Sequence, residues 1–182
     1  MMITKEKREE LLKQKGLVLW FTGLSGAGKS TIAEALSEEL HEMKKLCYVL
    51  DGDVLRTGLN SDLGLTPEDR DENIRRTYQV ASLFADAGVI VICATISPYT
   101  KARRDAREKA GDGFVEVFIN CPVSECILRD PKGLYKRFNN GEFLGMTGID
   151  APYQIPENPE LILNTHENDV ESCVKKIIEY IF

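Results

Sequence analysis

Short, uninterrupted runs of apolar residues alternate along the chain with segments in which apolar side chains recur at helical spacing. Such a run predicts a strand buried on both faces, and recurrence every three or four residues predicts an amphipathic helix. The predicted strands are residues 17–21, 46–50, 89–94, 114–119 and 161–163. The predicted helices are residues 3–14, 31–43, 66–87, 99–110, 122–128 and 167–181. This alternation indicates an α/β fold, with a parallel sheet covered by helices on both faces.

The helix predicted at residues 66–87 carries clear start and stop signals. Thr66 is a hydroxyl cap, Pro67 suits the first turn, and acidic residues follow near the positive end of the helix dipole. Gly88 comes directly after the last helical position, where a glycine readily adopts the left-handed conformation that ends many helices. These signals set the bounds of this helix.

The chain has 182 residues, a length that suits one domain with a full hydrophobic core. We expect residues 1–182 to form a single domain, with residues 1–16 as an N-terminal helical extension. Residues 129–160 are rich in glycine, proline and charge and show no clear period. An irregular segment of this length in a compact domain is more often a functional lid than a plain connection, so a lid is expected there.

Composition narrows the classes of partner and compartment. The formal net charge of −6 argues against a broad basic face, so no nucleic-acid partner is expected. The sequence has no apolar stretch that would span a membrane and no apolar core of a signal peptide, which predicts a cytoplasmic protein without a membrane partner. The five cysteines are scattered, mostly inside apolar runs, and lack zinc-ligand spacing, so buried reduced thiols are expected.

A glycine-rich segment with the pattern Gly-x-x-x-x-Gly-Lys-Ser joins the first predicted strand to the helix at residues 31–43. Between a buried strand and a helix, this pattern predicts a loop that binds nucleotide phosphates through its backbone amides and the helix N-terminus. Lys29 suits the β- and γ-phosphates of ATP, and the hydroxyl of Ser30 suits Mg²⁺. The expected ATP-binding residues of this loop are Gly23, Leu24, Ser25, Gly26, Ala27, Gly28, Lys29, Ser30 and Thr31.

The phosphate loop alone does not separate a kinase from a switch or a motor. A GTPase would be expected to carry an Asn-Lys-x-Asp motif, which the chain lacks. A motor ATPase would usually have a strand ending in acidic residues, whereas the strand at residues 89–94 continues into Thr95-Ile96-Ser97. The small size and the lid-like segment favour a nucleoside or metabolite kinase with the three-layer P-loop fold, which uses ATP and Mg²⁺.

Two aspartates flank a glycine where the second predicted strand ends, in Asp51-Gly52-Asp53. Open α/β sheets bind ligands at this edge, next to the phosphate loop. A carboxylate there can orient an attacking hydroxyl, accept its proton or hold Mg²⁺ through water. The alternative is a plain Asp-Gly turn. Asp53 is the first choice for the catalytic base, and with Ser30 it is a candidate for the metal site.

Basic residues follow in two groups. The first contains Arg56, Arg70, Arg75 and Arg76, and Arg70 shares a helix face with Asn73. Guanidinium groups match phosphate and sulfate oxygens, although some of these arginines are expected to pair with nearby acids on the surface. The second group lies in the lid-like segment and contains Arg129, Lys132, Lys136 and Arg137. A basic lid could close over ATP and exclude water, and Arg129 is assigned to ATP there.

Taken together, these stretches resemble the adenylylsulfate (APS) kinases over nearly the whole chain. The matching residues are Leu19 to Thr31, Leu50 to Asp53, Glu68-Asp69-Arg70, Glu72 to Arg76, Ile96 to Tyr99, Arg129 to Lys136, and Thr147 to Tyr153. The resemblance implies Mg²⁺-dependent transfer from ATP to the 3′-hydroxyl of adenosine 5′-phosphosulfate (APS), which gives 3′-phosphoadenylylsulfate (PAPS) and ADP in sulfate assimilation. The implied partner is thus a small-molecule nucleotide. Relatives are commonly dimeric, so a homodimer is an open alternative.

The resemblance also implies roles for particular residues. Asp53 matches the catalytic carboxylate of the family. The positions that match substrate-binding residues are Asp51, Arg56, Arg70, Asn73, Ile96, Ser97 and Lys132, with Thr147 in the next matching stretch. Ser97 also matches a serine proposed as a phosphorylated intermediate, which makes it a third catalytic candidate beside Asp53 and Lys29. Direct in-line transfer is preferred, because no base for Ser97 is visible in the sequence.

Two positions depart from the family pattern. Most relatives have phenylalanine where this chain has Leu65 and Met146, and these rings are expected to sandwich the substrate's adenine. Leucine and methionine can still pack on a base, but stacking of about 1–3 kcal/mol per base would be lost or replaced. Three alternatives follow: weaker binding of APS, a divergent kinase for another conjugate such as cytidine diphosphoramidate, or a non-catalytic nucleotide-binding regulator. The joint retention of four residues argues against the last: Lys29, Ser30, Asp53 and Arg56.

Overall fold

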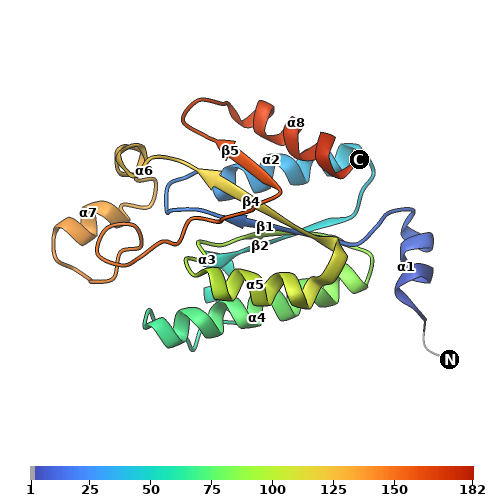
Figure 1. Cartoon of the computed structure of the whole chain (residues 1–182), viewed down its shortest axis with the longest axis horizontal. Helices are drawn as coiled ribbons and strands as arrows, with labels where there is room; N and C mark the ends of the chain where they lie inside the picture. The colour runs from blue at the N-terminus through green and yellow to red at the C-terminus, as the bar shows by residue number, and fades with distance from the viewer. Residues whose placement is uncertain (1–2) are drawn as a thin grey trace.

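The computed structural model describes residues 3–182 and shows a five-stranded sheet between two layers of helices (Figure 1). The order of the strands is β2-β3-β1-β4-β5, and every neighbouring pair is parallel. The strands are β1 (Leu17–Thr22), β2 (Cys47–Asp51), β3 (Ile90–Ala94), β4 (Phe114–Asn120) and β5 (Leu161–Asn164). The α/β fold predicted from the apolar runs is confirmed.

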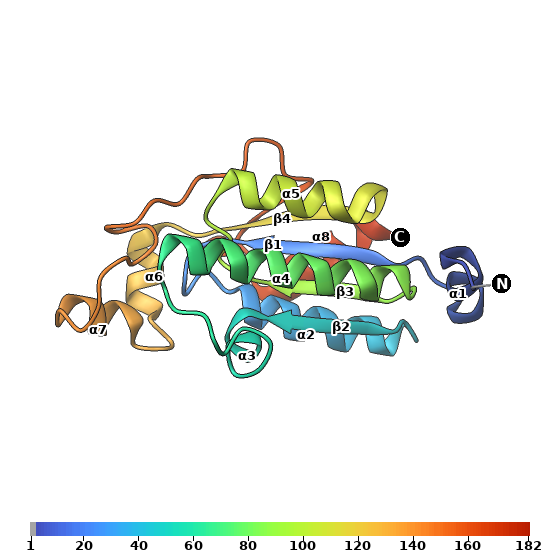
Figure 2. The same cartoon turned by 90° about the horizontal axis from the view of Figure 1, so that it is seen from below.

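Helices cover both faces of the sheet, and two further groups lie at its ends (Figures 1 and 2). Helices α2 (Lys29–Glu42) and α8 (Val170–Ile181) cover one face, whereas α4 (Pro67–Asp86) and α5 (Thr100–Ala110) cover the other. Helix α1 (Lys5–Leu12) lies near the amino ends of the strands. At the opposite end lie α3 (Gly52–Arg56), α6 (Val123–Arg129) and α7 (Leu134–Asn139), and a 3₁₀ turn (Gly111–Gly113) precedes β4.

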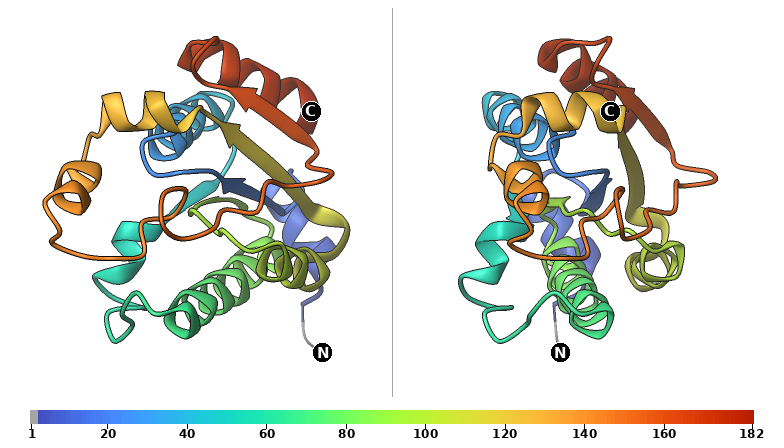
Figure 3. Two further views of the ribbon diagram at one scale, coloured as in Figure 1. Left: turned by 60° about the vertical axis from the view of Figure 1, so that its left-hand side comes forward. Right: turned by 90° about the vertical axis from the view of Figure 1, so that its left-hand side faces the viewer.

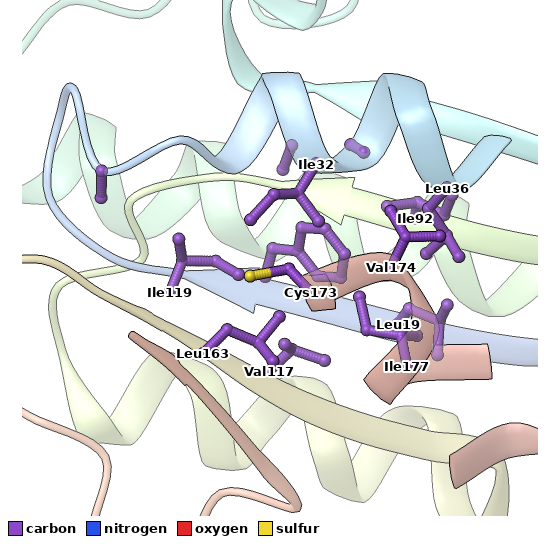
Figure 4. Close-up of a cluster of buried hydrophobic side chains, with 14 of the residues drawn as sticks. Leu19, Ile32, Leu36, Ile92, Val117, Ile119, Leu163, Cys173, Val174 and Ile177 are labelled. Carbon is purple, nitrogen blue, oxygen red and sulfur yellow. The ribbon is translucent and has the colours of Figure 1, made fainter. Parts of the chain in front are cut away.

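The central strand β1 is buried on both faces because each layer of helices supplies a separate apolar core. Leu19 and Phe21 belong to the core under α2 and α8. Val18 and Trp20 face the opposite core, under α4 and α5. Figure 4 shows side chains of the first core, in which residues from β1, α2 and α8 converge. Two-sided burial explains why β1, β3 and β4 read as continuous apolar runs rather than as alternating patterns, whereas the edge strands β2 and β5 are partly exposed.

The ends of α4 agree with the signals in the sequence. The hydroxyl of Thr66 accepts a hydrogen bond of 3.1 Å from the backbone N–H of Asp69, which caps the helix. Gly88 has a φ of +87°, in the left-handed region that glycine tolerates best. The backbone N–H of Gly88 bonds the carbonyl of Ala85 over 3.0 Å, so the chain turns here into β3.

Two short helices were not predicted, because side chains from the adjoining loops specify them. Helix α3 begins directly after β2, and the Asp51 carboxylate caps it by accepting a 2.8 Å hydrogen bond from the N–H of Asp53. Helix α7 lies inside the segment at residues 129–160. The carboxylate of Asp130 accepts hydrogen bonds from the N–H groups of Tyr135 and Lys136 in its first turn. Neither helix is long enough to show an apolar period. Between residues 3 and 182, no helix combines the length and the apolar character needed to cross a membrane.

Substitution of Leu36 on α2 tests how much the first core contributes to stability, because this residue is completely buried there. Leu36→Ala should lower the free energy of unfolding by about 2–5 kcal/mol, since it removes buried methyl groups and leaves a cavity. Leu83→Ala, on the exposed side of α4, is the matched control and should change it by less than about 0.5 kcal/mol. Urea denaturation followed by circular dichroism measures both. Equal losses in the two variants would contradict the assignment of this core.

Candidate functional site

A cleft of about 870 Å³ lies at the carboxyl ends of the strands. The phosphate loop, the start of α4, the Thr95–Pro98 turn and the segment after β5 line it, together with parts of residues 129–147. In Figure 3 the chain runs from α6 and α7 past the start of α4 and α5 before it returns to β5. Segments distant in sequence therefore surround one cavity at the edge where open α/β sheets bind ligands.

The phosphate loop connects β1 to α2, and side chains from later elements fix its carbonyls. The hydroxyl of Tyr135 donates a 2.9 Å hydrogen bond to the carbonyl of Ser25, and the hydroxyl of Thr165 donates one of 2.7 Å to that of Ala27. Gly23 has a φ of +155°, and a Cβ there would lie 2.4 Å from the backbone oxygen of Ile119. The loop thus keeps its carbonyls engaged, which leaves the amides at the start of α2 for an anion.

Lys29 is buried and folds back on its own loop. Its ammonium group donates hydrogen bonds to the carbonyls of Gly23 and Leu24, at 2.9 and 2.7 Å. Burial, and then the positive charge of Lys132, lower the pKa of Lys29 from its usual value to about 8. Phosphate oxygens in the cleft would favour the charged form, so the position of Lys29 suits an anionic ligand.

The carboxylate of Asp51 joins the phosphate loop to the start of α3. One oxygen accepts a 2.6 Å hydrogen bond from the hydroxyl of Ser30, and the other accepts the bond from the N–H of Asp53. The side chain of Asp53 forms an ion pair with Lys132, which reaches across from the segment between α6 and α7. This geometry confirms that the strand end and the phosphate loop are neighbours in space.

The residues around Ser30 suit Mg²⁺ only in the form that kinases use. Within residues 3–182 no three histidine, cysteine, aspartate or glutamate side chains gather as a metal site. Magnesium in kinases keeps several waters and phosphate oxygens and needs only one or two protein ligands. The hydroxyl of Ser30 beside the carboxylate of Asp51 fits such a partial set. The structure places Asp51, rather than the expected Asp53, directly against Ser30.

Basic and amide side chains from α3 and α4 line the other half of the cleft. Arg70 donates hydrogen bonds to the carbonyl of Leu65, the hydroxyl of Thr147 and the carbonyl of Gly145, at 3.0, 2.9 and 2.6 Å. Asn73 accepts a 2.9 Å hydrogen bond from the buried amide of Asn60. Arg56 also donates hydrogen bonds from its guanidinium group, to the carbonyls of residues 63 and 64. Arg70 ties the start of α4 to the segment that crosses the cleft, whereas Arg56 and Asn73 bond the loop that precedes α4.

The other arginines of the first basic group do not face the cleft. Arg75 and Arg76 both form ion pairs with Glu72, and Arg76 also pairs with Asp62. The pKa of Glu72 falls to about 2 because the two guanidinium groups donate hydrogen bonds to it. The interpretation as surface ion pairs therefore holds for these two arginines.

The Thr95–Pro98 turn continues from β3 and carries Ser97. The hydroxyl of Ser97 accepts a 3.1 Å hydrogen bond from the indole N–H of Trp20, and the residue has a φ of +40°. The carbonyl of Ile96 accepts a 2.8 Å hydrogen bond from the hydroxyl of Thr22. No carboxylate or imidazole bonds the Ser97 hydroxyl within the described chain, so the turn offers no base that would activate it.

The positions that depart from the family pattern both line the cleft. Leu65 precedes α4 and its side chain is 54% exposed. Met146 lies in the coil after α7 and is buried against the first core. Arg129, at the end of α6, lies on the side of the phosphate loop and donates a 2.7 Å hydrogen bond to the carbonyl of Thr165.

Most of the expected site residues meet in this one cleft. Those that line it are Ser25, Gly26, Gly28, Lys29, Ser30, Thr31, Asp51, Asp53, Arg56, Leu65, Arg70, Asn73, Ile96, Ser97, Arg129, Lys132, Met146 and Thr147. Gly23, Leu24 and Ala27 lie behind the loop surface, and their carbonyls accept hydrogen bonds. Sequence reasoning missed Thr165 and Asn168, which also line the cleft. Their position just after β5, at the carboxyl edge, was the available signal.

The family model and the relatives that match this chain all belong to one family. The family model described as Adenylylsulphate kinase matches residues 15–164. The adenylyl-sulfate kinase of Clostridium acetobutylicum is 58% identical over 98% of this chain and 90% of its own length. The probable adenylyl-sulfate kinase of Bacillus subtilis is 52% identical over 98% of this chain and 91% of its own length.

Solved structures agree. The structure of the Mycobacterium tuberculosis APS kinase CysC in complex with AMPPNP and APS has a TM-score of 0.87 and 45% identity, and the match covers 91% of this chain and 97% of that one. A gluconokinase from Sinorhizobium meliloti, at 17% identity and a TM-score of 0.63 over 91% of each chain, shares the fold alone. The phosphate loop, the cleft and these matches together show that the chain belongs to the adenylylsulfate kinase family.

Proposed function

We propose that this chain transfers the γ-phosphoryl group of ATP to the 3′-hydroxyl of APS, which yields PAPS and ADP for sulfate assimilation. The observation that carries the proposal is the carboxylate of Asp51. It accepts hydrogen bonds from Ser30 of the phosphate loop and from the N–H of Asp53, the candidate base. The donor and acceptor halves of the cleft meet at this group. The related structure with AMPPNP and APS supports the same pair of nucleotides.

The donor half is the phosphate loop with Lys29 and Arg129. On binding ATP, Lys29 exchanges the carbonyls of Gly23 and Leu24 for phosphate oxygens. Ser30 and Asp51 are the residues that would hold Mg²⁺, which neutralises charge on the β- and γ-phosphates when bound. Because the carboxylate of Asp53 forms an ion pair with Lys132, we assign Asp53 to the acceptor rather than to the metal.

The acceptor half contains Asp53 as base, with Arg56, Arg70, Asn73 and Lys132 as donors toward the anionic group of APS. All five line the same cleft. Guanidinium and amide donors suit phosphate and sulfate oxygens. Lys132 lies in the segment at residues 129–160, which we propose acts as the lid. Binding of APS gives Lys132 a second anion besides Asp53.

Transfer is direct in this scheme. The hydroxyl of Ser97 accepts its hydrogen bond from Trp20, and no carboxylate or imidazole bonds it within the described chain. A covalent intermediate would need a base at that position. We therefore assign Ser97 and Ile96 to substrate binding.

Two features outside the chemistry complete the proposal. We propose that the chain acts in the cytoplasm, the compartment that its sequence predicts. A homodimer stays a prediction of the family resemblance. The APS kinase of Thiobacillus denitrificans, at 34% identity and a TM-score of 0.69, is hexameric, and the match covers 94% of this chain and 29% of that one.

Purified protein with Mg·ATP should form ADP when APS is added, in a coupled assay that follows ADP release. Asp53→Ala should lower kcat by about 10²- to 10⁴-fold, because it removes the proton acceptor, and should leave the Kd of ATP within about twofold. Asp71→Ala, an exposed acid on α4, is the control and should retain activity.

The same assay with other nucleotide conjugates tests the acceptor. Turnover of a pyrimidine conjugate but not of APS would defeat the primary proposal, and ATP binding without any turnover would favour the regulator. A large loss of ATP affinity in Asp53→Ala would move Asp53 to the metal.

Leu65→Phe tests how the cleft holds the adenine of APS. An added ring should lower the KM for APS by about fivefold or more, since stacking on a base contributes about 1–3 kcal/mol. Leu144→Phe is the matched control, because it makes the same change at a leucine that is 82% exposed and does not line the cleft. Initial rates at varied APS measure both. An unchanged KM in Leu65→Phe would place the base elsewhere.

The low pKa of Lys29 predicts a pH dependence of ATP binding. In the free protein this pKa is about 8, and bound phosphates raise it because an anion favours the ammonium form. Binding therefore takes up a proton, and the affinity for ATP falls as the pH rises above about 8, by up to tenfold per pH unit. Calorimetric titration measures the Kd at each pH. Lys29→Met should bind more weakly and without this slope, and an equal slope in both proteins would contradict the assignment.

A further inference from the structure

Arg103 on α5 is buried although the sequence analysis gave it no role. Arg103 is 3% exposed, and its Nε donates a 2.8 Å hydrogen bond to the carboxylate of Glu116 on β4. Burying an ion pair costs several kcal/mol in desolvation, and apolar replacements of such pairs are often neutral or stabilising. Stability alone is therefore a weak reason for an arginine here.

The remaining nitrogens of Arg103 bond two segments that border the cleft. Nη1 donates a 2.7 Å hydrogen bond to the carbonyl of Ser97, in the Thr95–Pro98 turn. Nη2 donates one of 2.7 Å to the carbonyl of Gln154, in the coil that returns from the cleft to β5. One rigid guanidinium thus joins two backbone carbonyls that lie 57 residues apart in sequence (154 − 97). A planar fork with fixed donor directions suits this task better than a lysine.

The backbone of Ser97 needs such support. Its φ of +40° lies in the left-handed region, which is unfavourable for a residue other than glycine and persists only where the surroundings enforce it. Trp20 bonds its hydroxyl and Thr22 bonds the preceding carbonyl. Arg103 donates the shorter of two hydrogen bonds to the carbonyl of Ser97, at 2.7 Å, and the hydroxyl of Thr22 donates the other at 3.4 Å. Arg103 therefore acts on the group whose direction depends on this conformation.

The coil at Tyr153 and Gln154 is fixed at the same place. The N–H of Gln154 donates a 2.8 Å hydrogen bond to the carbonyl of Pro98, and its side-chain oxygen accepts one of 2.7 Å from the N–H of Thr100. The ring of Tyr153 stacks on Phe118. Upstream in this coil, Met146 and Thr147 line the cleft. Arg70 holds this coil at Gly145 and Thr147, and the contacts at positions 153 and 154 fix it a second time further along.

We infer that Arg103 is a positioning residue of the acceptor site, which locks the Ser97 turn and the returning coil into one arrangement while Glu116 fixes its own orientation. The inference deepens the proposed function and rests on it for the identity of the acceptor. Arg103 lies outside the residues that line the cleft and acts through Ser97 and the coil that carries Thr147. Within the described residues, Arg103 forms no hydrogen bond with the phosphate loop. The inference therefore leaves the binding of ATP independent of Arg103.

Arg103→Met removes the clamp and keeps most of the side-chain volume. The kcat/KM for APS should fall by about 10- to 100-fold, since small misplacements of substrate-binding groups have effects of this size. The KM for ATP should stay within about twofold. Arg107→Met is the matched control, because Arg107 lies one turn further on α5 and pairs with Glu160, and at 3.4 Å with Glu116, but bonds neither Ser97 nor Gln154. It should leave both KM values within about twofold. Equal effects of the two variants, or an equal loss for ATP and APS, would overturn the inference.

A cycle with Ser97→Gly separates positioning from a general loss of structure. Glycine adopts a positive φ at little cost. The fold-loss in kcat/KM for APS caused by Arg103→Met should therefore be smaller in the Ser97→Gly background than in the wild type. Arg103→Lys, which keeps the charge but lacks the fork, should show a loss in the same direction. An identical fold-loss in both backgrounds would refute action through the backbone of Ser97.

Hydrogen exchange on the protein without ligands gives a readout that does not need the correct acceptor. Arg103→Met should speed amide exchange in residues 95–99 and 147–156, whereas Arg107→Met should leave both segments unchanged. If the wild type fails to phosphorylate APS but these segments respond, the proposed function fails and the clamp stands. If APS is turned over and the segments do not respond, the clamp fails and the function stands. Should Arg103→Met not fold, Arg103→Lys carries the same comparison.

Discussion

The carboxylate of Asp51 holds the two halves of the cleft together. It is the last residue of β2, and its oxygens accept hydrogen bonds from Ser30 on α2 and from the N–H of Asp53 on α3. The parallel order of β2, β3 and β1 brings these elements to the same edge. The distance between the bound phosphates and the candidate base therefore depends on one short side chain with little freedom. Lysine and arginine donors from more distant segments are arranged around this fixed centre.

The phosphate loop owes its shape to side chains far away in sequence. Tyr135 of α7 and Thr165 after β5 bond its carbonyls. Lys29 bonds two more carbonyls of the same loop. Carbonyls that are occupied by donors leave the amides to face the cleft, so the anion site exists before a nucleotide arrives. Such preorganisation lowers the reorganisation that binding and transfer would otherwise require.

Local chemistry explains which parts could be predicted from the sequence. The three inner strands could be predicted because they are buried on both faces. The loop at Gly23 to Ser30 could be predicted because its residue types follow from contact with phosphates. Helix α7, Thr165 and Arg103 were not visible. Their places depend on contacts with Asp130, Ala27 and the Ser97 and Gln154 carbonyls, which no local pattern encodes. The hydroxyl of Ser30 bonds Asp51, whereas Asp53 was the expected neighbour. The sequence does not distinguish the two aspartates, because both lie in the motif Asp51-Gly52-Asp53.

The ion pair between Lys132 and Asp53 bears on a hazard that every enzyme handling ATP faces. A water molecule beside the γ-phosphate competes with the intended hydroxyl, and a free carboxylate nearby would assist it. In the ligand-free protein the carboxylate of Asp53 is engaged by Lys132. In the proposed reaction, an acceptor that carries its own negative charge gives Lys132 a second anion and so weakens its ion pair with Asp53. Competition between an anionic acceptor and Asp53 for Lys132 thereby links the freedom of the proposed base to the presence of that acceptor.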